Sequence, residues 1–251
     1  MVKKSVLAAW RKPASYRARV VTGRCGLGTT ATREYNRVVL EPDMLLAAYR
    51  RGIFPMAVDP DKGDRAGRRG HIGWFSPDPR AVIPLDEHFH IPHGLRRVLK
   101  QGKFEVTSDT DFETVVRECA KRKEGTWISK EIIDSYCRLH RLGHAHSIEA
   151  RLHPKAASSS RISRPSSLSL VGGLYGVAIG GAFFGESMFH RAPDASKVAL
   201  VALVERLRAR GFVLLDTQWI TPHLRQFGAY EIPRHEYLWR LEHALRLECR
   251  F

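Results

Sequence analysis

Two polar side chains at the end of an apolar segment are the first candidates for chemistry. Residues 212–219 read FVLLDTQW and have the composition of a β-strand. Because side chains alternate between the faces of a strand, Asp216 and Gln218 are predicted to point the same way. A partly desolvated carboxylate attracts a proton, and an amide both donates and accepts hydrogen bonds. The alternative is a pair of exposed polar residues where the strand ends.

A second carboxylate, Glu186, interrupts the apolar segment 182–189, AFFGESMF. A lone Glu in such a segment must reach solvent in a cleft or find a partner. If its strand lies beside that of Asp216, two carboxylates and an amide meet at one cleft. Such a cluster would bind a cationic amine and remove its proton.

The histidines His140, His144 and His146 invite comparison with a metal site. His140 and His144 lie on either side of Gly143, the expected end of a helix, and no carboxylate follows at ligand spacing. We therefore favour ordinary histidines and expect no metal. The sequence also lacks a Walker loop, a GxGxxG motif after a strand and a GxSxG elbow, so ATP-driven, Rossmann and serine-hydrolase chemistries are not supported.

The charge balance favours a polyanionic partner. The chain of 251 residues has 41 Lys and Arg against 26 Asp and Glu, a net charge of +15. Nucleic acid is the commonest such partner, and a solubilising surface is the alternative. Arg96, Arg97 and Lys100 share one face of an expected helix, which suits phosphate contacts or a solvated charged face.

Residues 1–33 contain eight basic residues and no acid, so we expect a disordered basic extension. An organelle transit peptide is the alternative interpretation. The four cysteines are scattered without a CxxC pair, which fits a reducing cytoplasm.

The apolar stretch 168–189 resembles a membrane span in composition only. It holds six glycines and Glu186, and Gly180-Gly181 lies between two β-prone halves. A β-hairpin of two buried strands is therefore predicted, and no membrane partner is expected.

Periodicity and helix stop signals predict the remaining elements. We expect a mixed α/β (α+β) fold with a mostly antiparallel sheet, and flexible loops at 57–71 and 153–169. Asp194 or Ser196 is expected to cap the fourth helix. The predicted helices are 42–51, 111–122, 130–142, 194–210 and 234–245, and the predicted strands are 145–152, 170–179, 182–189 and 212–219.

Eight motifs taken together resemble the leucyl/phenylalanyl-tRNA–protein transferase family. The resemblance spans about residues 35–245, in order along the chain. The motifs are YRRGIFPM (49–56), WFSPDPRAVIP (74–84), GTWIS (125–129), LHRLGHAHSIE (139–149), LVGGLYGVAIGGAFFGESMF (170–189), DASKVAL (194–200), LLDTQ (214–218) and FGAYEIPR (227–234).

The resemblance implies a small N-terminal domain at 34–79 and an N-acetyltransferase-like catalytic domain at 80–251 with the insert 153–169. It implies transfer of Leu or Phe from charged tRNA to the α-amino group of proteins that begin with Arg or Lys. Such proteins would be marked for N-end rule degradation in the cytoplasm. No cofactor is implied, because the aminoacyl ester already carries the activation.

The resemblance also implies roles for particular residues. Asp216 and Gln218 match the catalytic pair, and Glu186 matches an acid of the same cleft. Trp127 matches an aromatic residue near the terminal adenosine, and Met56 stands where some members have a Trp. Arg97 and Lys100 match contacts to the tRNA acceptor stem, with Arg96 beside them. The pocket for the transferred side chain would consist of Leu174, Phe183, Met188, Leu203 and Leu207.

Two other functions remain open. An acyl-CoA-dependent N-acetyltransferase would need a run of backbone N–H donors, and the segment 190–194, HRAPD, is poorly suited to supply it. A non-catalytic tRNA-binding protein would bind charged and uncharged tRNA alike and would not need Asp216.

Overall fold

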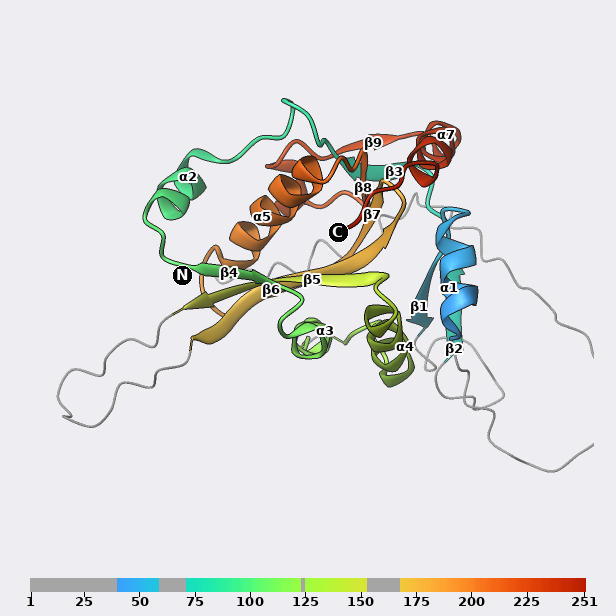
Figure 1. The fold of residues 1–251 in the computed structure, drawn as a ribbon, viewed down its shortest axis with the longest axis horizontal. Helices are drawn as coiled ribbons and strands as arrows, with labels where there is room; N and C mark the ends of the chain where they lie inside the picture. Colours follow the sequence, from blue (N-terminus) through green and yellow to red (C-terminus); the bar gives the residue numbers. More distant parts are fainter. Residues whose placement is uncertain (1–39, 59–70, 123–124, 153–167) are drawn as a thin grey trace, which may run out of the picture.

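The structure, a computed structural model, describes residues 40–58, 71–122, 125–152 and 168–251 (Figure 1). The predicted extension 1–33 lies outside these residues. So do residues 59–70 and 153–167, which make up most of the two predicted loops.

Helices and strands alternate irregularly along the described residues. The helices are α1 (Pro42–Tyr49), α2 (His93–Lys100), α3 (Phe112–Ala120), α4 (Lys130–Arg141), α5 (Ala195–Ala209), α6 (Pro222–Arg225) and α7 (Arg234–Leu245). The strands are β1 (Phe54–Val58), β2 (His71–Phe75), β3 (Arg80–Ile83), β4 (Glu105–Ser108), β5 (Ala145–Leu152), β6 (Ser169–Ile179), β7 (Ala182–His190), β8 (Leu214–Gln218) and β9 (Tyr230–Ile232).

A seven-stranded sheet in the order β4-β5-β6-β7-β8-β3-β9 is the centre of the fold. Its described pairs are antiparallel except β7 with β8, which run parallel. The prediction of a mixed fold with a mostly antiparallel sheet is confirmed. The short strand β3 comes early in the chain and lies between the two last strands, β8 and β9.

A second, two-stranded sheet of β1 and β2 lies beside α1 (Figure 1). Phe54 of β1 pairs with Phe75 of β2 and meets the edge of Trp219, with 5.2 Å between the Phe54 and Trp219 ring centroids. Helix α1 begins with Pro42, and Gly52 follows its end with φ 70°, a left-handed conformation that favours glycine. This turn leads the chain from α1 into the small sheet.

Two apolar clusters cover the two faces of the large sheet. Helices α3 and α4 lie on one face and α5 on the other (Figure 1). The α3/α4 cluster includes Leu45, Tyr49, Val115, Ile132, Tyr136, Tyr175, Phe184, Leu214 and Tyr237. The α5 cluster includes Ile148, Leu174, Phe183, Leu200, Leu203, Val204, Leu207 and Leu215.

Most of the predicted elements are present within about two residues of their expected ends. The predicted hairpin is also present, with Gly180 at φ 57° in its turn. Among the described residues, no helix is long and apolar enough to cross a membrane. The prediction of a side-chain cap on α5 is wrong: Asp194 has φ 67° and its carboxylate accepts instead from Lys197, at 2.8 Å.

Candidate active site

A buried ion pair between Arg80 and Asp216 lies at the centre of the candidate site. Arg80 begins β3, Asp216 lies on the neighbouring β8, and their side chains are only 1% and 0% exposed. Nε of Arg80 donates to Oδ1 at 2.9 Å, and Nη2 donates to Oδ2 at 2.6 Å. This two-pronged geometry is the strong form of an Arg–carboxylate contact. The expectation of a partly desolvated carboxylate is wrong in degree, because Asp216 is entirely buried.

Two further donors complete the surroundings of the Asp216 carboxylate. The Tyr237 hydroxyl donates to Oδ2 at 2.9 Å, and the backbone N–H of Gln218 donates to Oδ1 at 2.9 Å. Burial is the largest single effect on the pKa of Arg80 and lowers it, but the charge and hydrogen bonds of Asp216, together with Tyr237 and Glu186, raise the pKa overall. The carboxylate is therefore engaged by protein groups on both oxygens.

Gln218 departs from the alternation that the sequence predicts. Its φ of 60° is left-handed, so the regular geometry of β8 ends at this residue. The pairing of β3 with β8 also shifts register between Ala81 and Val82. The Gln218 side chain is 4% exposed, and its Nε2 has no hydrogen-bond partner among the described residues. The Gln218 amide therefore keeps an unpaired donor among the residues that the structure describes, whereas both oxygens of Asp216 accept hydrogen bonds.

Glu186 lies at a bulge in the β6–β7 pairing. Gly176 pairs with Gly185 and Tyr175 pairs with Ser187, which leaves Glu186 as the extra residue of β7. Its carboxylate accepts from Tyr49 at 2.7 Å and from Tyr136 at 3.2 Å, and the two hydroxyls also contact each other. Burial raises the pKa of Glu186 to about 8, against the opposing effect of the Tyr49 hydrogen bond. At neutral pH, Glu186 is mainly protonated.

The two carboxylates lie on neighbouring strands, which meets the condition set in the sequence analysis. Phe184 of β7 pairs with Asp216 of β8. Glu186 contacts Tyr49 and Asp216 contacts Tyr237, and both tyrosines belong to the α3/α4 cluster. The Asp216 charge also contributes to the raised pKa of Glu186.

The predicted pocket residues come together on the opposite face of the sheet. Leu174, Phe183, Leu203 and Leu207 are buried in the α5 cluster, and Met188 is partly buried against it. Leu174 and Met188 are directly paired across β6 and β7. Strand β7 therefore contributes Phe183 and Met188 to the predicted pocket and Glu186 to the contacts with Tyr49 and Tyr136.

Trp127 and Met56 lie close to each other at the small sheet. The backbone N–H of Ala57 donates to the Trp127 carbonyl at 3.0 Å, and both side chains are partly buried against the α3/α4 cluster. The indole Nε1 of Trp127 is buried without a partner in the described part of the chain. Met56 and Trp127 therefore lie near each other in the fold. Both could contact the same ligand only in such an arrangement.

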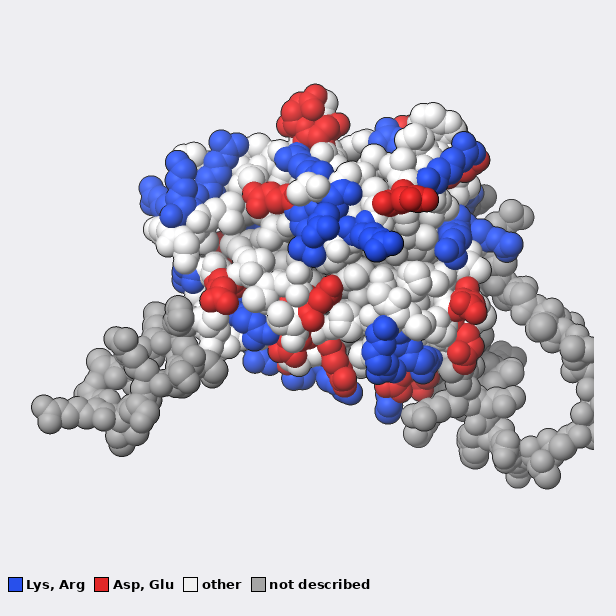
Figure 2. All heavy atoms as spheres, viewed as in Figure 1, with Lys and Arg blue, Asp and Glu red and all other residues white. Residues whose placement is uncertain are grey.

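The predicted tRNA contacts are exposed on α2. Figure 2 shows Lys and Arg side chains gathered over this helix. Arg96, Arg97 and Lys100 are all on its outer side, and Nε of Arg96 donates to the Ile91 carbonyl at 3.0 Å. Arg97 and Lys100 are the more available pair for phosphates.

The histidines contact a carboxylate that the sequence analysis did not single out. Nδ1 of His146 lies 2.7 Å from Asp109 Oδ2, and Nδ1 of His140 lies 3.8 Å from Oδ1. The His140 ring also stacks on Phe112. These contacts are structural ones within the fold.

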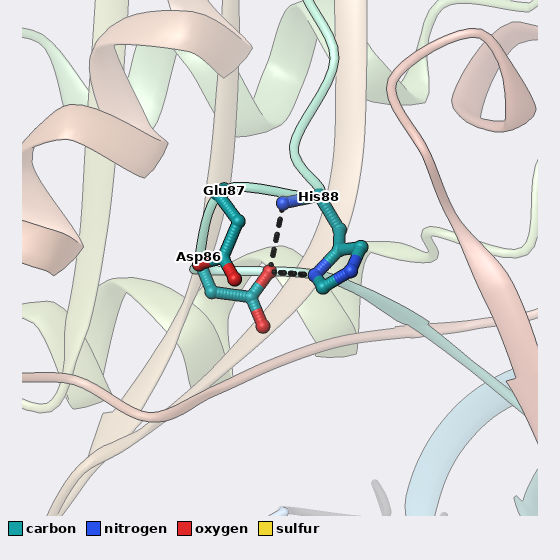
Figure 3. Close-up of side chains that lie close together, drawn as sticks. All are labelled: Asp86, Glu87 and His88. Atoms are coloured by element: carbon teal, nitrogen blue, oxygen red, sulfur yellow. Dashed lines mark hydrogen bonds and ion pairs between the residues drawn. The ribbon is translucent and has the colours of Figure 1, made fainter.

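Among the described residues, one group has side chains close enough to share a metal ion: Asp86, Glu87 and His88 (Figure 3). All three residues are exposed, and Asp86 accepts from the backbone and ring of His88 at 3.0 Å. The backbone N–H of His88 is the main cause of the lowered pKa of Asp86. The group is a surface turn formed by successive residues.

Four residues of the site were missed as chemical candidates: Arg80, Tyr49, Tyr136 and Tyr237. Arg80 and Tyr49 lie within the quoted motifs WFSPDPRAVIP and YRRGIFPM. An Arg at the start of the short apolar segment RAVI shows no sign of burial in the sequence, so it points to no particular acidic partner.

The fold and site define a mixed α/β protein with a buried polar centre, an adjoining apolar cluster and an exposed basic helix. A family model described as leucyl/phenylalanyl-tRNA protein transferase matches residues 82–242, and the model of that family's N-terminal domain matches residues 39–78. The chain belongs to this family. The predicted resemblance and the predicted class, an aminoacyltransferase enzyme, are confirmed.

Curated relatives agree over most of the chain. The leucyl/phenylalanyl-tRNA–protein transferase of Akkermansia muciniphila is 50% identical over 208 residues, which cover 82% of this chain and 96% of the relative. That of Rubrobacter xylanophilus is 52% identical over 212 residues, covering 84% and 98%. Among solved structures, FemX is similar with a TM-score of 0.46 and 10% identity, covering 76% of this chain and 66% of FemX.

Proposed function

We propose that the protein transfers Leu or Phe from charged tRNA to the α-amino group of proteins that begin with Arg or Lys. Proteins so modified would enter N-end rule degradation in the cytoplasm. The observation that carries the proposal is the side-chain amide of Gln218, whose buried Nε2 has no partner among the described residues. Gln218 follows two residues after Asp216, which pairs with Phe184 of β7. Family membership supplies the reaction in which that amide would act.

In this reaction an amine must attack the ester carbonyl and lose a proton. A free α-amine has a pKa near 8, so part of it is neutral at pH 7. We assign Gln218 to orient the amine. Asp216 would hold the Gln218 backbone, and Glu186 would lie on the neighbouring strand β7. Much of the rate would come from holding the two substrates together. The hydroxyl beside the leaving oxygen on the terminal ribose would relay the proton.

The α5 cluster supports the choice of Leu and Phe. Leu174, Phe183, Met188, Leu203 and Leu207 would supply the apolar lining of the pocket, and burying one Leu or Phe side chain is favourable by about 1.5–3 kcal/mol. A β-branched side chain would bring a methyl group against the neck of such a pocket. The tRNA would lie against Arg97 and Lys100, with its terminal adenosine near Trp127 and Met56.

The preference for Arg or Lys at the acceptor N-terminus depends on the family resemblance. Arg80 neutralises Asp216, and burial keeps Glu186 mainly protonated, so neither supplies a full unpaired negative charge at neutral pH.

The test is transfer of labelled Leu or Phe from charged tRNA to a peptide with N-terminal Arg. We expect labelled peptide, and no product when the peptide N-terminus is acetylated. Acetyl-CoA serves as the alternative donor. Acetylation of the peptide without transfer from tRNA would overturn the proposal in favour of an N-acetyltransferase. Equal binding of charged and uncharged tRNA without any product would favour a non-catalytic tRNA-binding protein.

A further inference from the structure

Arg80 joins three segments that are distant in the sequence. Its guanidinium donates to Asp216 on β8 through Nε and Nη2, and Nη1 donates to the carbonyl of Gly52 at 3.0 Å. The guanidinium carbon also lies 4.5 Å from the centroid of the Tyr237 ring on α7. One side chain therefore connects the α1–β1 turn, the end of β8 and the last helix.

The Asp216 carboxylate links Arg80 to Gln218 through hydrogen bonds to one of its oxygens. Oδ1 accepts from both Nε of Arg80 and the backbone N–H of Gln218, each at 2.9 Å. The orientation of the carboxylate plane thus fixes where the Gln218 N–H must lie. Because Gln218 has a left-handed backbone, which is unfavourable for a residue other than glycine, its conformation needs such an anchor.

We propose that Arg80 is a positioning residue for aminoacyl transfer. Its two-pronged contact orients Asp216, which holds the backbone N–H of Gln218 and thereby places the Gln218 side-chain amide for the reacting amine. The inference rests on the proposed function. Within it, Asp216 acts as an anchor rather than as a proton acceptor, since protein donors already engage both of its oxygens.

A purely structural ion pair is the competing explanation. Buried ion pairs contribute little net stability compared with apolar side chains of the same volume, so stability alone is a weak reason for this pair. The planar guanidinium of Arg80 donates to both carboxylate oxygens of Asp216 at once. A Lys ammonium keeps the positive charge but lacks this two-pronged geometry. The substitution Arg80→Lys therefore separates charge from orientation.

The experiment compares wild type, Arg80→Lys and Arg117→Lys. Arg117 is the matched control, since Nε and Nη2 both contact Glu113, but on the exposed surface of α3. For Arg80→Lys we expect kcat for transfer to fall at least about 10-fold, with KM for both substrates within about 3-fold. Hydrogen exchange of the Gln218 backbone N–H should accelerate by a similar factor. Arg117→Lys should match wild type in both measurements.

Coupling to Gln218 distinguishes positioning from general loosening of the fold. In a Gln218→Ala background, Arg80→Lys should cause little further loss of kcat. A full additional loss of about 10-fold, or a reduced kcat with unchanged exchange at Gln218, would overturn the inference.

Tyr237→Phe is the milder variant should Arg80→Lys fail to fold. It removes one donor to Oδ2 and keeps the ring over Arg80. We expect a fall in kcat of about 3-fold together with faster exchange at Gln218, and no change in either would contradict the inference. If wild type transfers nothing, the proposed function fails. The exchange measurement still decides whether Arg80 fixes Gln218.

Discussion

The Tyr49 hydroxyl on α1 donates a 2.7 Å hydrogen bond to Oε1 of Glu186 on β7, across 137 residues of sequence. A second hydroxyl, from Tyr136 on α4, reaches the other oxygen. A single carboxyl group therefore connects two helices to the bulge of the central hairpin. Because this carboxyl is buried, its protonation is linked to folding.

The raised pKa of Glu186 predicts how stability depends on pH. The unfolded carboxyl titrates near 4.5 and the folded one near 8, so between these values the folded state binds more protons. Glu186 should therefore reduce the free energy of unfolding as pH rises from about 4.5 to 8, by at most about 1.4 kcal/mol per pH unit. Urea unfolding of wild type and Glu186→Gln across about pH 5–9 measures this effect. The variant should have the flatter profile, and identical profiles would contradict the prediction.

Asp216→Asn should impair both folding and transfer. The variant leaves the Arg80 charge buried without its partner, at a cost of about 3–5 kcal/mol. Turnover per folded molecule should fall about 100-fold, the scale of a misplaced reacting group, because Gln218 loses its anchor. Thermal melting and single-turnover transfer on one preparation measure the two effects. Asp134→Asn is the control, because Asp134 accepts from Lys130 at 2.7 Å and is 35% exposed. Wild-type turnover by folded Asp216→Asn would remove Asp216 from the site.

Leu174→Trp should block transfer of Phe more than binding of tRNA. Leu174 is 3% exposed in the α5 cluster, so the larger ring fills the proposed pocket and overpacks it by about 1–3 kcal/mol. The control is Ile179→Trp, on the same strand but in the α3/α4 cluster. It should cost similar stability without changing the KM for Phe-tRNA. Equal losses of transfer and tRNA binding in Leu174→Trp would locate the pocket elsewhere.

Arg97→Ala and Lys100→Ala should weaken tRNA binding and its dependence on salt. Removing one phosphate-binding side chain should reduce the slope of log K against log salt by about 0.7–0.9. Binding titrations between low and moderate salt measure this slope. Arg117→Ala is the control, since it removes one exposed charge paired with Glu113 on α3. An unchanged slope in both α2 variants would exclude this helix from tRNA binding.

Local patterns were sufficient to predict much of the fold. The hairpin followed from Gly180-Gly181 between β-prone halves, and the long helices followed from apolar spacing and glycine stops. The neighbouring positions of Glu186 and Asp216 required only that β7 and β8 be adjacent, as they are. By contrast, β3 is four residues long and buried throughout, so it has no alternation to detect.

The missing parts of the site depend on long-range pairing. Nothing within RAVI indicates that Arg80 meets a carboxylate 136 residues later. The left-handed backbone of Gln218 lies beside the register shift with β3, so the alternation assumed along β8 is carried one residue too far.

The position of β3 between β8 and β9 has a consequence for synthesis on the ribosome. Arg80 is translated 136 residues before Asp216, which at about 5–20 residues per second corresponds to about 7–27 s. During this interval β3 has neither of its neighbouring strands, and its guanidinium stays hydrated. The centre of the site is therefore assembled only as the last part of the chain emerges, so a truncated translation product contains Arg80 without the carboxylate that neutralises it.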